Sequence, residues 1–263
     1  MILPYSPIMW VGSKARAVPT LTTLVPHDVT HVVSGFAGGC SFEIAMALAG
    51  LTVQAYDINP YLVNYWLFQL SEPVILADRI ELVHREFERA CYQRLDRILP
   101  SLTPLNRAAA FYALVRSAFY NIFPGGTYAK GHPNFKERRI DRVRDFRCPR
   151  LSVSMQDFRV TLSIHPQDFL WLDPVYFKKD RRLYGIKEFP HEELAALLRG
   201  HKGRFLLTYN DHPYIRSLYR DYHIIPVDGK WRYSAGGTKV SDEIIILNYD
   251  PPKGSVTVDG RLA

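Results

Sequence analysis

Residues 29–57 read VTHVVSGFAGGCSFEIAMALAGLTVQAYD, and their pattern indicates the fold class of the chain. The segment His31-Val32-Val33 predicts a short buried strand, and a glycine-rich turn follows at residues 35–39. A helix is predicted from about Phe42, and a second strand at residues 51–56 ends on Asp57. Strand, turn, helix and strand form one βαβ unit, which predicts the start of a parallel sheet.

The second half of the chain returns to strand patterns after a long helical part. Leu62 to about Ala118 is predicted to be helical, with interruptions at Pro73, Pro100 and Pro104. Later strands are predicted at residues 151–155, 169–172, 204–208 and 243–248, with a helix at 191–199. We therefore expect an α/β protein with one discontinuous domain, residues 1–66 and 151–263, and a helical, basic insertion at residues 67–150.

Composition narrows the class of protein. The chain has 263 residues, of which 47% are hydrophobic and 22% charged, as expected of a protein with a packed core. It has no apolar run of about 18 residues, so we expect no membrane span, and its start does not indicate secretion. The three widely spaced cysteines, Cys40, Cys91 and Cys148, argue against disulfides or a metal cluster. They fit a reducing cytoplasm.

The charge of the chain favours a polyanionic partner. Lysine and arginine number 33 against 26 acidic residues, which gives a net charge of +7 and a pI near 9.3. Residues 136–150 contain seven basic residues interrupted by three acids. Such a run can grip phosphates, although it is also typical of a solvated helix face.

The glycine turn and Asp57 together suggest a nucleoside cofactor. Glycines between a strand and a helix let a ligand approach the backbone. Asp57 closes the next strand, 19 residues after Gly38, where a carboxylate can accept both hydroxyls of a ribose. The alternatives are an ordinary strand–helix turn and a helix N-cap ahead of Pro60.

A second signal follows the predicted strand at residues 169–172. The sequence continues as Asp173-Pro174-Val175-Tyr176. The Asp173 carboxylate and the Pro174 carbonyl are hydrogen-bond acceptors, and Tyr176 offers a flat face. These features suit a planar base with an exocyclic amine, while a β-turn after a core strand is the alternative interpretation. Two weaker signals are the loop lysine Lys14, which could hold a carboxylate, and the polar residues after the predicted strand at 204–208.

In chain order these pieces resemble the Dam-type (D12 class) DNA N6-adenine methyltransferases over nearly the whole chain. The joint order and spacing of the motifs carries the resemblance, since each motif alone is weak. The matching segments are Trp10-Val11-Gly12-Ser13-Lys14 (W-x-G-G-K), Phe36-Ala37-Gly38-Gly39-Cys40-Ser41 (F-x-G-x-G-S), Ala55-Tyr56-Asp57-Ile58-Asn59 (D-x-N), Gln156-Asp157-Phe158 (D-F), Asp173-Pro174-Val175-Tyr176 (D-P-P-Y) followed by Tyr184 and Phe189, Tyr209-Asn210-Asp211-His212, and Ala235-Gly236-Gly237-Thr238 with the strand at 243–249.

The resemblance implies a Rossmann-like S-adenosylmethionine-dependent methyltransferase sheet with a DNA-recognition insertion. S-adenosylmethionine would be the methyl donor, with no metal required. The implied cofactor contacts are Trp10 and Lys14 at the methionine end, Phe36 and Gly38 in the glycine turn, Asp57 on the ribose, Asp157 and Phe158 at the adenine, and Asp173 at the junction with the substrate.

The same resemblance implies that the methyl acceptor is N6 of an adenine flipped out of double-stranded DNA. Asp173 and Pro174 would accept the two amine hydrogens, and Tyr176 would stack on the base. Residues 67–150 would bind DNA in the cytoplasm of a bacterium or of a phage-infected cell, in restriction–modification, phage modification or epigenetic marking. The oligomeric state stays open. The implied DNA contacts are Arg116, Tyr120, Asn121, Tyr128, Asn134, Lys136, Arg138, Arg139 and Arg142.

The sequence departs from the family pattern in three segments. Val175 replaces the second proline, Ser34-Gly35 replaces the usual Glu-Pro before Phe36, and Ser13 replaces a glycine. None removes a group that the chemistry requires. The alternatives that remain are an amino-methyltransferase acting on RNA adenine or on cytosine N4, and a DNA-binding member of the family with weakened turnover.

Overall fold

A computed structural model describes residues 6–123, 126–129, 135–178, 188–227 and 243–253. Its centre is a seven-stranded sheet in the order β3-β2-β1-β4-β5-β7-β6. Strand β7 runs antiparallel to β5 and β6, and the other neighbours are parallel. The strands are β1 His31–Ser34, β2 Thr52–Asp57, β3 Leu151–Met155, β4 Phe169–Leu172, β5 Phe205–Asn210, β6 His223–Val227 and β7 Glu243–Leu247.

The predicted βαβ unit is confirmed. Helix α2 (Ser41–Leu48) connects β1 to β2, and the two strands pair in parallel with Val33 opposite Gln54. Strand β1 also pairs with β4, so it lies inside the sheet, and Val32 and Val33 are fully buried. A strand covered on both faces needs a continuous apolar run, which explains the sequence of β1.

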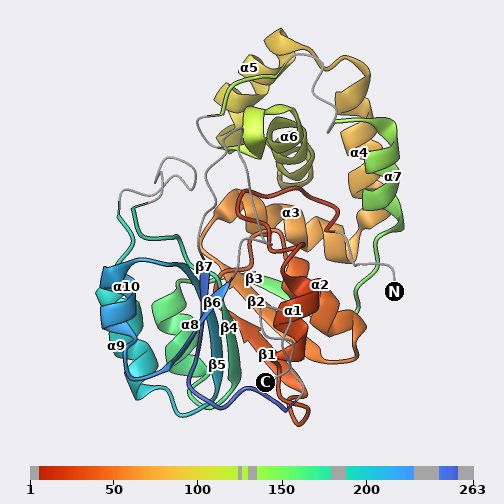
Figure 1. The fold of residues 1–263 in the computed structure, drawn as a ribbon. Coiled ribbons are helices and arrows are strands. Elements are labelled where there is room, and N and C mark those ends of the chain that lie inside the picture. Colours follow the sequence, from red (N-terminus) through yellow and green to blue (C-terminus); the bar gives the residue numbers. More distant parts are fainter. Residues whose placement is uncertain (1–5, 124–125, 130–134, 179–187, 228–242, 254–263) are drawn as a thin grey trace.

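Helices cover both faces of the sheet (Figure 1). Alternate strand residues point to opposite faces, so Trp171 packs in one hydrophobic cluster while Leu170 and Leu172 pack in the other. Helices α1 (Val18–Thr23), α2 and α3 (Pro60–Ser71) contribute to the cluster of Trp171. Helices α8 (Phe158–Ile164), α9 (His191–Gly200) and α10 (Pro213–Leu218) contribute to the cluster on the other face.

The long helical stretch is divided by its prolines in a specific way. Pro60, Pro73 and Pro104 each occupy the first turn of a helix, where a missing N–H costs nothing. The prolines therefore begin helices as well as interrupting the stretch. The elements are α4 Pro73–Arg85, α5 Arg89–Ile98, η1 Leu99–Ser101, α6 Pro104–Ser117, η2 Phe119–Asn121 and α7 Glu137–Asp145.

Helices α4 to α7 lie together at one end of the molecule, beyond α3 (Figure 1). Helix α3 packs against β3 on one side and α6 on the other, so it joins this group to the sheet. It is also continuous across residues 66 and 67, where the predicted domain boundary falls. Among the described helices, none is both long and apolar enough to cross a bilayer.

Candidate active site

The carboxyl ends of the parallel strands bring the predicted site residues to one edge of the sheet. Asp57 is the last residue of β2, and Asp173 directly follows β4, with β1 between these two strands. The glycine turn leaves the same edge between β1 and α2. Open α/β sheets bind their ligands at this edge. The two sequence signals, 116 residues apart in the chain, therefore belong to one region.

Asp57 is fixed against the glycine turn. Its Oδ2 accepts a hydrogen bond from the Gly38 N–H at 3.0 Å, and its Oδ1 accepts one from the Asn59 N–H at 2.9 Å. Burial raises the pKa of Asp57, and the N–H groups of Asn59 and Gly38 oppose that rise. Each carboxylate oxygen carries a second lone pair, so the side chain can still accept two ligand hydroxyls. The alternative interpretation, in which Asp57 is the N-cap of the following helix, is wrong, because the N-cap of α3 is Asn59.

Trp10 packs against the glycine turn. Gly38 has a φ of +48°, which favours glycine, and a Cβ atom there would lie 3.2 Å from Trp10 Cδ1. A Cβ on Gly39 would lie 3.2 Å from Trp10 Cβ. The indole is 8% exposed and its ring centroid lies 5.8 Å from that of Phe111 in α6. The geometry gives Trp10 a packing role beneath the turn, and its predicted cofactor contact stays a prediction.

Three phenylalanines form a cluster beside the turn. The ring centroids of Phe36, Phe158 and Phe189 lie 5.5–5.7 Å apart, so residues from three separate sequence motifs meet here. Asp157 caps α8 by accepting a hydrogen bond from the Arg159 N–H at 2.8 Å. The Arg159 guanidinium lies over the Phe158 ring and also pairs with Glu193. This cluster forms an aromatic wall next to the edge that carries Asp57.

Asp173 is held by two partners from distant parts of the chain. The Lys14 ammonium lies 2.8 Å from each carboxylate oxygen, and the Thr208 hydroxyl donates to Oδ1 at 2.7 Å. The Lys14 and Asp173 side chains are 10% and 17% exposed. Burial lowers the pKa of Lys14, but the carboxylates of Asp173, Glu243 and Glu43 outweigh that effect and raise it overall. Lys14 is therefore a cation held within a group of carboxylates.

Tyr176 lies between Lys14 and strand β7. Its hydroxyl donates to Glu243 Oε2 at 2.9 Å, and the Lys14 ammonium lies 4.8 Å from its ring centroid. Burial, with Asp173 and Glu243 nearby, raises the pKa of Tyr176 well above its usual value, so the phenol stays protonated. The motif Asp173-Pro174-Val175-Tyr176 thus forms one face of a polar site. Sequence reasoning missed Thr208 and Glu243.

Two of the departures from the family pattern have local partners. The Ser34 hydroxyl donates to Glu43 Oε1 at 2.6 Å, and both side chains are buried. Burial raises the pKa of Glu43 to about 8. The Ser13 hydroxyl lies 2.9 Å from that of Ser41 and so ties the Lys14 loop to the start of α2. The serines therefore join the N-terminal loop, β1 and α2 around the glycine turn.

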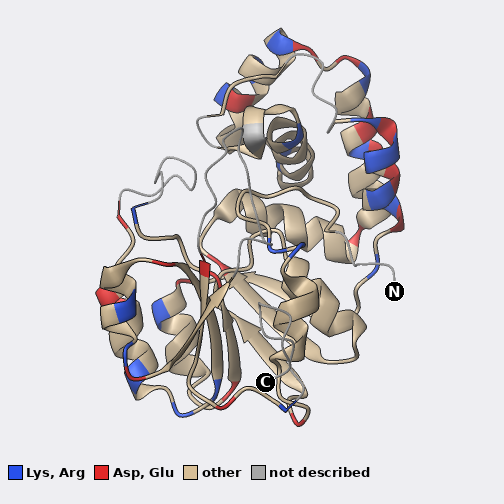
Figure 2. Ribbon diagram, in the orientation of Figure 1, with Lys and Arg blue, Asp and Glu red and all other residues tan. Residues whose placement is uncertain are grey.

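The expected DNA-contact residues separate into exposed and buried groups. Lys136, Arg138 and Arg142 are exposed on or just before α7, and Arg139 is half-buried. The ribbon in Figure 2 shows basic and acidic positions mixed along α7 and α4. Between these helices, Arg144 pairs with Asp78 and Glu81. Helix α7 packs on α4 and buries Ile140 and Val143, so its exposed face carries arginines together with Glu137, Asp141 and Asp145.

Arg116 does not fit its expected role. Its side chain is 1% exposed and lies against Tyr112, because α6 is buried around much of its circumference. Asn121 is 5% exposed, with a φ of +56°. These two side chains are buried and are not available to DNA.

The other expected DNA contacts in this part of the chain are less fully described. Half-buried Tyr128 packs near Tyr92. The backbone of Tyr120 lies in η2, and Asn134, Tyr184 and Ala235–Thr238 lie outside the described residues.

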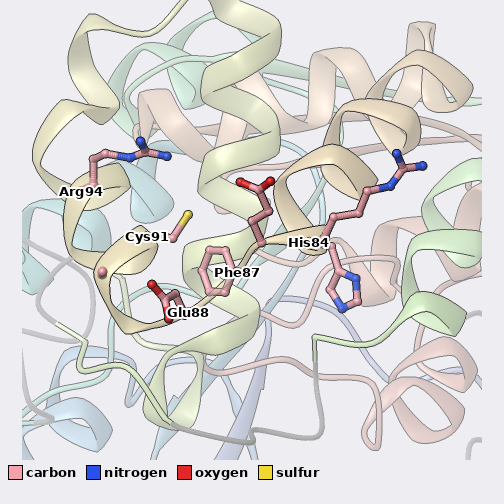
Figure 3. Close-up of a pocket in the computed structure, with 8 residues that line it drawn as sticks. His84, Phe87, Glu88, Cys91 and Arg94 are labelled. Carbon is pink, nitrogen blue, oxygen red and sulfur yellow. The ribbon is translucent and has the colours of Figure 1, made fainter.

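A separate hollow lies between α4 and α5, lined by residues such as His84, Phe87 and Arg94 (Figure 3). None of its lining residues belongs to the sheet edge that carries Asp57 and Asp173. In the part of the chain that the structure describes, no three histidine, cysteine or acidic side chains gather as potential metal ligands.

Solved structures of other proteins have a weak likeness to this chain. Solved structures similar to this chain include a precorrin 8W decarboxylase from Methanobacterium thermoautotrophicum (14% identity, 95% of this chain and 100% of that chain, TM-score 0.41). They also include a precorrin-6y C5,15-methyltransferase from Geobacter metallireducens GS-15 (12%, 89% and 87%, 0.38). A third is the glycopeptide N-methyltransferase MtfA complexed with S-adenosyl-L-methionine (11%, 88% and 92%, 0.36). These TM-scores are too low to support an inference about the function of this chain.

A search of curated proteins by sequence finds no match. The family model of the D12 class N6 adenine-specific DNA methyltransferases matches residues 10–232, which include the Lys14 loop, the glycine turn, Asp57 and the Asp173 motif. The match covers most of the chain and agrees with the order of motifs at the sheet edge. The chain therefore belongs to the D12 class N6 adenine-specific DNA methyltransferase family.

Proposed function

We propose that Asp173, Pro174 and Tyr176 form the catalytic group of this methyltransferase, acting on the N6 amine of an adenine flipped out of double-stranded DNA. The observation that carries the proposal is the position of this motif after β4, at the sheet edge where Asp57 closes β2. A nucleoside cofactor at Asp57 and a base at Asp173 would lie on neighbouring parts of that edge.

The cofactor that suits this edge is S-adenosylmethionine. Asp57 can accept the two ribose hydroxyls, the phenylalanine wall suits an adenine ring, and the Lys14 cation suits a carboxylate. Gly38 leaves the backbone open to a close approach. When bound, this cofactor would supply a methyl group on a sulfonium sulfur, and that sulfur would leave as a neutral thioether. We therefore propose that the reaction needs no metal.

Within the chain, catalysis is a matter of charge and position. An aromatic amine is a poor nucleophile because its lone pair is delocalised into the ring. The Asp173 carboxylate and the Pro174 carbonyl would accept hydrogen bonds from its two N–H groups and stabilise the positive charge that develops on nitrogen during attack. The methylated nitrogen would then release one proton to solvent. Stacking on Tyr176 would hold the base in the plane that this geometry requires. Lys14 donates to Asp173 Oδ2 and lies 2.8 Å from Oδ1, so the amine would share this carboxylate with the Lys14 ammonium.

DNA would bind along α7 and the adjoining part of the insertion. Lys136, Arg138 and Arg142 are exposed there, and half-buried Arg139 has its pKa lowered by burial and by neighbouring arginines. A concentration of cations that repel one another is stabilised by an anion such as phosphate. Phosphate contacts position the duplex, while sequence choice needs contacts with base edges. Tyr128 and Asn134 stay predictions for that role. We place the reaction in the cytoplasm of a bacterium or of a phage-infected cell.

The direct test is the chemical identity of the product. Tritiated S-adenosylmethionine would be incubated with the protein and a panel of unmethylated DNA and RNA, followed by nucleoside analysis. We expect N6-methyladenine in DNA. Label in RNA adenine or in N4-methylcytosine would replace the proposed substrate. Binding of both substrates without incorporation would indicate a member of the family with weakened turnover.

A further inference from the structure

The loop Asp173–Phe177 is tied to the sheet by three side chains that the proposed chemistry does not use. The Thr208 hydroxyl donates to Asp173 Oδ1 at 2.7 Å, and Glu243 Oε2 accepts from the Tyr176 hydroxyl at 2.9 Å. The Asn210 amide donates to the Phe177 carbonyl at 3.2 Å. The loop is thus held near its beginning and at its end.

These three side chains come from one face of the antiparallel pair β5 and β7. Thr208 and Asn210 are two residues apart on β5, and Glu243 of β7 lies directly opposite Asn210. The next pair along that face is Thr208 with Ile245. Residues that alternate along a strand, and residues opposite each other across a pair, share a face of the sheet. The hydrogen bonds therefore come from a rigid, ordered scaffold.

The polar side chains of Thr208 and Glu243 are notable because their neighbours in these strands are mostly apolar. Thr208 is fully buried and Glu243 is 8% exposed, between residues such as Leu207 and Ile244 that are also fully buried. A buried polar group costs free energy unless it is hydrogen-bonded. Asp173 and Tyr176, members of the proposed catalytic group, provide those hydrogen bonds.

We propose that Thr208, Asn210 and Glu243 are positioning residues that fix the catalytic loop and take the part of the proline that Val175 replaces. A proline restricts the backbone torsion φ and so limits the freedom of a loop, whereas valine leaves more freedom. Thr208 holds one oxygen of Asp173, and Glu243 fixes the orientation of the Tyr176 ring. The inference rests on the proposed function, because it assigns residues that orient that site.

The first experiment compares Thr208→Val with Thr208→Ser. Valine keeps the shape of the buried side chain but removes the donor, and serine restores it. Initial rates would be measured with tritiated S-adenosylmethionine on bulk DNA from a host without adenine methylation. We expect Thr208→Val to lower kcat by about tenfold or more while both KM values stay within about twofold, since the lost interaction orients a reacting group. Thr208→Ser should recover most of kcat.

Tyr65→Phe is the matched control. It removes another buried hydroxyl, which donates to Gln69 at 2.7 Å within α3, and it should leave kcat unchanged. Asn210→Ala, at a half-buried position, is the second tether variant and covers the case in which Thr208→Val does not fold. It should lower kcat severalfold. Thermal unfolding and binding of S-adenosylhomocysteine would be measured for every variant.

Val175→Pro tests the compensation itself. In the wild-type background it should change kcat little, whereas in Thr208→Val or Asn210→Ala it should recover several-fold of the lost rate. If Thr208→Val and Asn210→Ala keep the wild-type kcat, or if Tyr65→Phe loses as much kcat as they do, the inference is overturned while the proposed function stands. Equal effects of Val175→Pro in both backgrounds would also overturn it. Absence of turnover in the wild-type protein would contradict the proposed function, and this inference with it.

Discussion

The ammonium of Lys14 lies 2.8 Å from both carboxylate oxygens of Asp173 and 4.8 Å from the centre of the Tyr176 ring. A residue from the N-terminal loop thus holds two members of the proposed catalytic group, of which Asp173 lies 159 residues further along the chain. The contact resembles the one expected of the target amine, which would also donate to Asp173 and lie against Tyr176. In this structure Lys14 and Asp173 are paired with each other.

This ion pair should be measurable as a coupling in stability. Breaking a partly buried pair by removing one partner costs about 3 kcal/mol, because it leaves a charge without its partner. Lys14→Met and Asp173→Asn should each lower the free energy of unfolding, and the double variant should lose less than the sum of the two. Urea denaturation of the four proteins at neutral pH measures the coupling. Strictly additive losses would show that the two side chains do not interact.

Asp57 should govern affinity for the cofactor. Asp57→Asn replaces a carboxylate that accepts from Gly38 and Asn59 with a side chain that has one acceptor fewer. We expect binding of S-adenosylhomocysteine, measured by calorimetry, to weaken about tenfold or more, while DNA affinity changes little. Unaltered cofactor affinity would leave Asp57 as a support of the glycine turn alone.

The basic segment at α7 should determine the salt dependence of DNA binding. Combined replacement of Lys136, Arg138 and Arg139 by alanine should weaken binding. It should also lower the slope of log affinity against log salt by about 2 to 3, since each phosphate contact contributes about 0.9. Arg204→Ala is the control, because Arg204 is an arginine paired with Asp28 at the other end of the sheet. A slope unchanged by the triple replacement would make this segment a solvated helix face.

Glu43 should make stability depend on pH. Burial raises its pKa from 4.5 to about 8 in the folded protein. Between these values the folded state keeps a proton that the unfolded chain releases, so the free energy of unfolding falls as the pH rises through this window. The contribution is largest below the lower value, and the loss is complete above about pH 8.

Glu43→Gln removes this titration and keeps a similar shape. The free energy of unfolding of the variant, relative to that of the wild-type protein, should therefore increase between about pH 5 and about pH 8, by several kcal/mol at most. Urea denaturation at several pH values provides the measurement. A difference that does not vary with pH would mean that Glu43 ionises normally in the folded state.

Much of the fold could be predicted from local sequence. The βαβ unit at residues 29–57 has the expected order because a buried strand requires a continuous apolar run. Strand β6 was missed, since it lies at the sheet edge, contains Pro226 and is mostly not buried. The prolines at 60, 73 and 104 begin helices, a role that depends on position within the first turn.

The partners within the site could not be predicted in the same way. Thr208 and Glu243 lie in strands whose pattern indicates only a buried sheet, and their bonds to Asp173 and Tyr176 depend on strand order. Arg116 appears in sequence as one more basic residue of the insertion, yet the packing of α6 buries it. The sequence does contain one signal of this contact. Tyr112 and Arg116 are four residues apart, so they are neighbours on a helix.

Comparison of Asp173→Ala with the wild-type protein tests whether Asp173 is a catalytic residue for the methylation of adenine in DNA. Methyl transfer to unmethylated bulk DNA would be followed by nucleoside analysis, with DNA and cofactor binding measured in parallel and Asp173→Asn as the variant of similar shape. We predict that the wild-type protein forms N6-methyladenine and that both variants bind DNA but lose activity by about a thousandfold or more. Methyl transfer by Asp173→Ala at the wild-type rate would contradict the assignment of the active site.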